Sequence, residues 1–357
     1  MKDFFGRLVR QTGSLITRTA RLYHPQTLRE KGWIWASGLG VVTLIIVLFI
    51  VGLYWSIMPQ PFNVRDNTRN RLAETTLEPV TGSYTTVTLL TVIETLLEKP
   101  GGYLSNDVTP PSVFLDNMPN WEFGALTQVR DLARSLRNDM SRSQSQSLEN
   151  KDLAIAEPQF NYSNDSWIFP STEGEYRQGI EALERYLAGL SRQGKQNTQF
   201  FARADNLRDW LAVVEKRLGS LSQRLSASVG QERINTDLAG DPDAAQSTST
   251  NDQVTVQTPW LEIDDVFYEA RGSTWALIHF LQAVEIDFHD ILRKKNALVS
   301  LRQIIRELEA TQEPISSPMV LNGRGFGIFA NYSLVMASYI SRANAAVIDL
   351  RSLLSQG

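Results

Sequence analysis

The chain has 357 residues, 42% of them hydrophobic, and a formal net charge of −4. This composition can supply a packed core and excludes a disordered chain. No cysteine is present, which excludes disulfides, thiolate catalysis and cysteine-ligated zinc. Residues 1–32 carry a net charge of +5 and the remainder carries −9, an asymmetry that indicates different surroundings for the two parts.

Residues 33–58 form an apolar segment, and no charged residue occurs between Gly32 and Val64. A bilayer core needs about 20 apolar residues in a helix, and aromatic residues stand at both ends of this segment, as they do at membrane interfaces. The run exceeds the roughly 7–15 residues of a cleaved signal peptide's apolar region. A buried core helix would keep a polar face. We therefore expect an uncleaved transmembrane anchor whose partner is the lipid bilayer.

The basic residues before this segment favour a cytoplasmic N-terminus. Residues 59–357 are then periplasmic, and the protein is expected in a bacterial inner membrane. Within residues 1–32, apolar side chains recur at helical spacing between arginines. Two interpretations stay open: a cytoplasmic amphipathic helix lying on the anionic leaflet, or a flank that only sets the topology. The segment has no recognised nucleic-acid-binding module, so we expect no nucleic-acid partner.

Beyond residue 59 the apolar residues recur mostly every three or four positions, which is the period of an α-helix. Pro100-Gly101-Gly102 would end the first helix, and Asn120 can cap the second. Residues 141–150 form a polar linker. The expected helices are residues 86–99, 120–140, 173–193, 200–225, 261–288, 289–311 and 328–354.

The helix at 200–225 has the most regular pattern, with apolar residues in alternating steps of four and three. This is a heptad seam held for more than three repeats. It can pair within the domain or with a second copy of the chain. Self-association would use Leu207, Leu211, Val214 and Leu218.

Residues 229–257 contain almost no large apolar side chains, so we expect a mobile loop there. The last expected helix is rich in small residues, which allow close helix packing and suggest a central position. No strong strand alternation is found. The sequence therefore predicts an all-α fold, with a single N-terminal transmembrane helix followed by a periplasmic helical bundle.

Residues 101–124 are the segment in which catalytic chemistry is most conceivable. Asp107, Asp116 and Glu122 lie near aromatic residues in a periplasmic domain. Two carboxylates and nearby rings are what glycan cleavage requires. The alternative is a structural or docking loop, in which the aspartates make turns. Residues expected to bind a glycan or a protein are Tyr103, Asn117, Asn120 and Trp121.

Two further motifs are weaker. The glycine-rich run at 322–327 resembles a phosphate-binding loop, but it lacks the Lys-Ser/Thr ending and a preceding strand. Glu285 and His289 are four residues apart on one helix, but a single histidine makes a poor metal site. We expect no metal and no cofactor.

Three segments carry a family resemblance: GGYLSNDVTPPSVFLDNMPNWEFG (101–124), QVRDLARSLR (128–137) and GFGIFANYSLVMASYISRANAAVIDLRSLL (325–354). They resemble the proteobacterial membrane-protein family known as domain of unknown function twenty-three thirty-three. The resemblance runs from the apolar segment to the C-terminus. It implies a single-pass inner-membrane protein of unassigned activity and supplies no catalytic residues.

The sequence thus favours a non-enzymatic protein whose helical periplasmic domain is a structural or interaction module that binds envelope proteins. The alternative is a peptidoglycan- or glycan-binding or glycan-cleaving domain. A ligand sensor is disfavoured, because about 32 residues are too few for a cytoplasmic output domain.

Overall fold

The structure is a computed structural model, and it describes residues 23–143, 148–192, 198–234, 253–315, 317, 319–323 and 328–356. The chain forms two compact units, residues 1–54 and 55–357. The first unit contains α2 (Pro25–Lys31) and α3 (Trp33–Trp55) up to Tyr54, and Trp55, the last residue of α3, belongs to the second unit.

Helix α3 has 23 residues and contains no charged side chain. It is the one helix among the described residues that is long and apolar enough to cross a membrane. The stretch that meets this criterion has no buried part, so α3 is not a core helix.

The second unit is built almost entirely of helices, which confirms the expected all-α fold. Two short helices, α4 and α7, were not expected from the sequence. The segment at 289–311 is divided at Asn296, whose φ is +54°. The helices are α4 (Val64–Glu74), α5 (Ser83–Glu98), α6 (Asn117–Ser135), α7 (Leu153–Phe160), α8 (Thr172–Ser191), α9 (Ala204–Ser226), α10 (Ile263–Asp287), α11 (His289–Lys294), α12 (Leu298–Glu309) and α13 (Tyr332–Ser355).

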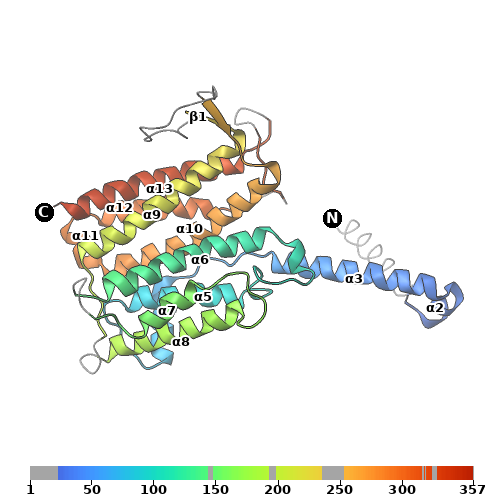
Figure 1. The fold of residues 1–357 in the computed structure, drawn as a ribbon, viewed down its shortest axis with the longest axis horizontal. Helices are drawn as coiled ribbons and strands as arrows, with labels where there is room; N and C mark the ends of the chain where they lie inside the picture. The colour runs from blue at the N-terminus through green and yellow to red at the C-terminus, as the bar shows by residue number, and fades with distance from the viewer. Residues whose placement is uncertain are drawn as a thin grey trace, which may run out of the picture. The chain divides into compact units, whose positions relative to one another are not determined.

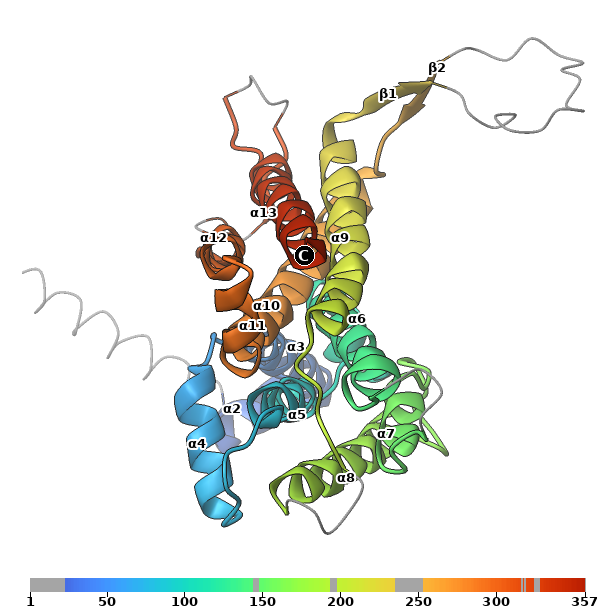
Figure 2. The same ribbon diagram turned by 90° about the vertical axis from the view of Figure 1, so that its left-hand side faces the viewer.

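The helices of this unit lie in three layers, which the end-on view in Figure 2 separates. Helices α9, α12 and α13 form one outer layer, α6 and α10 form the middle, and α5, α7 and α8 form the other side. The core helix is α10, which packs on α5, α6, α9, α12 and α13. The small residues of α13 suggested a central position for this helix. That expectation is wrong: α13 lies in an outer layer, between α9 and α12.

Helices α6 and α10 form the most extensive helix pair among the described elements, and two glycines make the close approach possible. A Cβ at Gly124 would lie 1.9 Å from the backbone oxygen of Glu269 on α10. A Cβ at Gly272 would lie 1.8 Å from the backbone oxygen of Trp121 on α6. Each helix thus presents a bare backbone to the other, and no side chain fits at either position.

The heptad seam of α9 is buried within the chain. Leu207, Leu211, Val214 and Leu218 are each at most 1% exposed, and α9 packs along α13. The second copy considered from the sequence is replaced by another helix of the same chain, so these four residues offer no surface for self-association.

Two expectations about loops require correction. Helix α6 begins at Asn117 and is capped by Asp116, whose carboxylate accepts from the N–H of Asn117; Asn120 lies inside its first turn. The ends of the expected loop at 229–257 pair as an antiparallel ribbon of β1 (Gln231–Ile234) and β2 (Gln253–Val256), with Gln231 opposite Val256. Residues 235–252, and residues 324–327 of the glycine-rich run, lie outside the described residues.

The two glycines predict a sharp difference between alanine substitutions. Gly272→Ala places a methyl group against the backbone of α6, and we expect the free energy of unfolding to fall by about 3 kcal/mol or more. Gly219→Ala, in the interior of α9, is the matched control, because its Cβ would meet nothing closer than 3.6 Å. That substitution should raise the free energy by roughly 0.5–1 kcal/mol through helix propensity. Chemical denaturation of the full chain followed by circular dichroism measures both; equal stability of the two variants would contradict the close-approach account.

Candidate functional site

The segment between α5 and α6 contains the residues that the sequence marked for chemistry, and Glu122 is at its centre. Its carboxylate is fully buried and lies 2.6 Å from the ammonium of Lys99, which is also buried. It accepts hydrogen bonds from the N–H groups of Leu104 (2.9 Å) and Ser105 (2.8 Å), and from the hydroxyl of Ser105. Lys99 donates its second bond to the backbone oxygen of Gly102 (2.6 Å). The loop is therefore wrapped around an internal ion pair.

Burial raises the pKa of Glu122, and the ammonium of Lys99 together with the hydrogen bonds opposes that rise. A carboxylate that already accepts from four groups and is closed off from solvent has no free face for a substrate. Glu122 thus stabilises the loop and does not point into a cleft. No sequence pattern identifies Lys99 as its partner, because the pairing needs α5 and α6 side by side.

The two aromatic residues proposed for binding are also interior. The ring of Tyr103 packs edge-to-face on that of Tyr176, with centroids 5.7 Å apart, and burial raises the pKa of its hydroxyl well above the usual range. Trp121 packs against Trp275 with centroids 5.1 Å apart. Neither ring is available to a ligand, since each is at most 3% exposed.

The remaining candidates lie nearer the surface, and the side-chain bonds of Asp116 and Asn120 are made within the fold. Asp116 caps α6. The side-chain amide of Asn120 donates to the backbone oxygen of Asp116 (3.0 Å) and to the carboxylate of Asp265 (2.7 Å), while Asn117 lies in the first helical turn. Burial raises the pKa of Asp107, and a bond with Ser112 opposes the rise. Glu122 is closed off from solvent and Asp116 is used as a cap, so among the described residues the segment offers no pair of free carboxylates for glycan cleavage.

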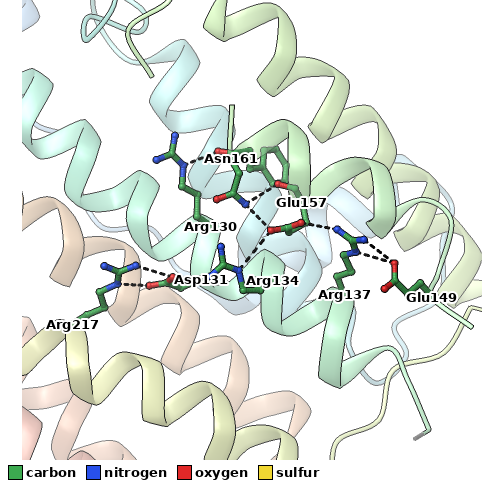
Figure 3. Close-up of polar contacts among 9 residues, drawn as sticks. Arg130, Asp131, Arg134, Arg137, Glu149, Glu157, Asn161 and Arg217 are labelled. Atoms are coloured by element: carbon green, nitrogen blue, oxygen red, sulfur yellow. Dashed lines mark hydrogen bonds and ion pairs between the residues drawn. The ribbon is translucent and has the colours of Figure 1, made fainter. Parts of the chain in front are cut away.

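The polar face of α6 binds its neighbours through arginines (Figure 3). Arg130 donates to the backbone oxygens of Phe160 (2.8 Å) and Tyr162 (2.7 Å) at the end of α7. Arg137 pairs with Glu157 at 2.8 Å and also with Glu149. On the other side, Arg217 of α9 binds Asp131 through two nitrogens, at 2.7 and 3.1 Å.

These guanidinium groups are occupied by internal acceptors. Arg130 and Arg137 attach α7 to the α6 segment, and Asp131 attaches α9 through Arg217. A similar account holds for Glu285, which pairs with Arg302 at 2.8 Å. His289 is exposed. No group of three metal-ligating side chains occurs within the described ranges.

His279, which the sequence analysis did not single out, attaches the segment after α3 to the core. The N–H of Phe62 donates to its Nε2 at 3.0 Å, and its Nδ1 lies 2.7 Å from the backbone oxygen of Trp275. The hydrogen bonds assign the proton to Nδ1. The ring also stacks on Phe62 at 4.0 Å. Burial lowers the pKa of His279 to about 4, so the imidazole is neutral in the folded chain.

Asp287, the last residue of α10, caps α5 from outside that helix. Its carboxylate accepts from the N–H groups of Gly82 (2.9 Å) and Thr85 (2.7 Å), and from the hydroxyl of Thr85. The start of a helix carries partial positive charge. Even so, burial raises the pKa of Asp287 to about 6, with these bonds opposing the rise.

The buried ion pair predicts strong coupling between Lys99 and Glu122. Lys99→Met and Glu122→Gln each leave one buried partner unpaired, and each should lower the free energy of unfolding by about 3–5 kcal/mol. The double variant should lose less than the sum, by about 2 kcal/mol. The half-exposed pair of Arg302 and Glu285 is the control, with an expected coupling of about 0–1 kcal/mol. Denaturant titration of all variants measures both cycles; additive losses at Lys99 and Glu122 would refute the pairing.

The neutral imidazole predicts a pH dependence of the stability. The pKa of His279 is about 4 in the folded chain and about 6.5 when unfolded, so its contribution is present above pH 6.5 and is lost as the pH falls towards 4. The loss of stability in His279→Gln should therefore be larger at pH 7 than at pH 4, by about 3 kcal/mol. Asp287, whose folded pKa is raised, has the opposite slope between about pH 4 and 6.

Thermal unfolding of the full chain across this range measures the effect on His279. His289→Gln, at an exposed position on α11, controls for the loss of an imidazole. A difference between His279→Gln and the unsubstituted chain that stays constant with pH would show that His279 is not held neutral.

Comparison with known proteins agrees with the resemblance seen in the sequence. A family model described as an uncharacterized protein conserved in bacteria (DUF2333) matches residues 28–357. The search of curated proteins gave no significant match, and neither did the search of solved structures. Because the matched region extends from α2 through the whole helical domain, the chain belongs to the DUF2333 family of bacterial proteins.

Proposed function

We propose that the protein is anchored in the bacterial inner membrane by α3, with its N-terminus in the cytoplasm. Its helical domain then acts in the periplasm as a structural or protein-interaction module of the cell envelope. The observation that supports this most directly is α3 itself, a 23-residue helix without charge whose apolar side chains have no cover from the described residues. Large side chains such as Phe49 and Ile50 are exposed along it. In water this surface is costly, and a bilayer covers it.

The sign of the flanking charge supports the orientation. Residues 1–32 carry a net charge of +5, and basic flanks stay on the cytoplasmic side. The length of the apolar run favours an anchor that is retained over a signal peptide that is removed.

The burial and internal pairing of the candidate catalytic residues support a binding role for the domain. Glu122, Tyr103 and Trp121 are held in the interior. Arg130 and Arg137 are held by acceptors of α7, and Arg217 of α9 is held by Asp131 of α6. A partner can therefore bind only to the outer surface of the domain. One open hollow of about 560 Å³ is lined by Glu149, Asn150, Lys151 and Gln199, among others, beyond the end of α6. Leu148 also lines it and is 92% exposed.

The proposal predicts an integral membrane protein of full length. The chain should stay with membranes after an alkaline carbonate wash and keep its intact mass of 40.2 kDa. External protease should digest the domain in spheroplasts but not in whole cells. Ile46→Arg places a charge in the middle of α3 and should reduce insertion; Ile155→Arg, at an exposed position on α7, is the control. A shortened, carbonate-soluble chain would show instead that α3 is a cleaved signal.

The same cells test the interaction role. A photo-crosslinking residue at Leu148 or Asn117 should give a discrete adduct with another envelope protein. Adducts with glycan fragments alone would revive the glycan-binding alternative, and the absence of any adduct at both positions would oppose an interaction through these surfaces.

A further inference from the structure

The helical domain exposes large apolar side chains at one of its ends. Three short segments contribute two each, and the six residues are called the apolar rim here. Phe114 is 77% exposed, Phe169 is 97% exposed and Trp260 is 77% exposed. Soluble domains rarely gather exposed side chains of this size, and such patches mark contact surfaces. The apolar rim consists of Val113, Phe114, Ile168, Phe169, Trp260 and Leu261.

The three segments directly precede α6, α8 and α10. They lie at the same end of the domain because hydrogen bonds connect the starts of these three helices. The amide of Asn106 donates to the backbone oxygen of Ser166 at 2.9 Å, which joins the segment before α6 to that before α8. The amide of Asn120 donates to Asp265 at 2.7 Å, which joins the start of α6 to that of α10. Figure 1 shows α6, α8 and α10 beginning at this one end.

The chain also enters the domain at this end. A Cβ at Gly101 would lie 2.7 Å from the ring of Trp55, so the loop that follows α5 packs directly on that tryptophan. Leu104 and Ser105 of the same loop bind Glu122 of α6. Trp55 is the last residue of α3. The chain that follows the anchor therefore joins the domain at the loop after α5, which also binds the start of α6.

We propose that the apolar rim inserts into the interface of the lipid bilayer, so that the domain rests on the membrane by its end. This proposal rests on the membrane anchoring proposed above. Phenylalanine and tryptophan are favoured at the boundary between headgroups and acyl chains. The bilayer therefore covers side chains that the domain itself leaves bare.

The charges around the rim specify the kind of lipid contact. The three segments that carry it, residues 103–116, 163–171 and 257–262, contain acidic residues and no lysine or arginine. These segments offer no basic side chain to anionic headgroups, so we expect a hydrophobic contact. It should form on neutral phosphatidylcholine and should be insensitive to salt, unlike a basic surface helix.

The chain has no cysteine, so single cysteines can be introduced and labelled without removing others. An environment-sensitive fluorophore is attached at Phe114→Cys, Phe169→Cys or Leu261→Cys in the full chain. Leu148→Cys is the matched control: it is an exposed apolar position next to Glu149, which binds Arg137 beyond the far end of α6. At 1.5 Å per residue that is roughly 30 Å from the start of α6. The labelled proteins are reconstituted in phosphatidylcholine vesicles that contain lipids with a nitroxide in the upper acyl chain.

At least twofold quenching at the three rim positions, with none at Leu148 and no change in 0.5 M salt, is the expected result. Equal quenching at the rim and at Leu148 would overturn the proposal. Co-flotation with the vesicles separates the two levels of inference. If the chain floats but the rim is not quenched, the rim proposal fails and the anchor stands. If the chain does not float, the anchor fails and the rim proposal fails with it.

Discussion

The contact on which the rest of the domain depends is the backbone-to-backbone crossing of α6 and α10. Gly124 and Gly272 let each helix touch the other's main chain, and this draws together everything those helices carry. Trp121 meets Trp275 beside the crossing, and Gln128 bonds Ser273 within the same interface at 2.8 Å. Because α10 also packs on the helices of both outer layers, the crossing joins the two halves of the bundle.

Buried polar groups then fix the connections that helix packing leaves undefined. Glu122 and Lys99 hold the loop after α5, His279 holds the segment at Phe62, and Asp287 holds the start of α5. Each polar atom buried in this way needs partners in defined places, so these groups select one path for the chain. Hydrophobic packing alone would tolerate several paths. Glu122, which the sequence marked as a catalytic candidate, thus has a structural role: it determines the path of a loop.

The sequence predicted the helices with strong apolar periodicity because that period reflects burial on one face. It failed where local signals competed. Asn120 and Asp116 are both good caps, and the choice between them depends on the bond from Asn120 to Asp265 on a distant helix. The partner of Glu122 was missed for a similar reason: the burial of Glu122 depends on the loop after α5 folding over it and bringing Lys99 to its carboxylate, and no local pattern predicts that contact. The ribbon of β1 and β2 was not recognised because each strand has only four residues and β1, Gln-Glu-Arg-Ile, does not alternate.

The glycine crossing also sets a height along the bundle axis. Gly124 is seven residues into α6 and Gly272 is nine residues into α10, so at 1.5 Å per residue the crossing lies about 10 Å and about 13 Å from the two helix starts. The loops that precede these helices, with Phe114 on one and Trp260 on the other, therefore end within a few ångströms of one common plane. A slip of one helical turn along the crossing would tilt that plane by moving one loop about 5 Å beyond the other. Gly124 and Gly272 thus keep the loops before α6 and α10 at the same height along the bundle axis.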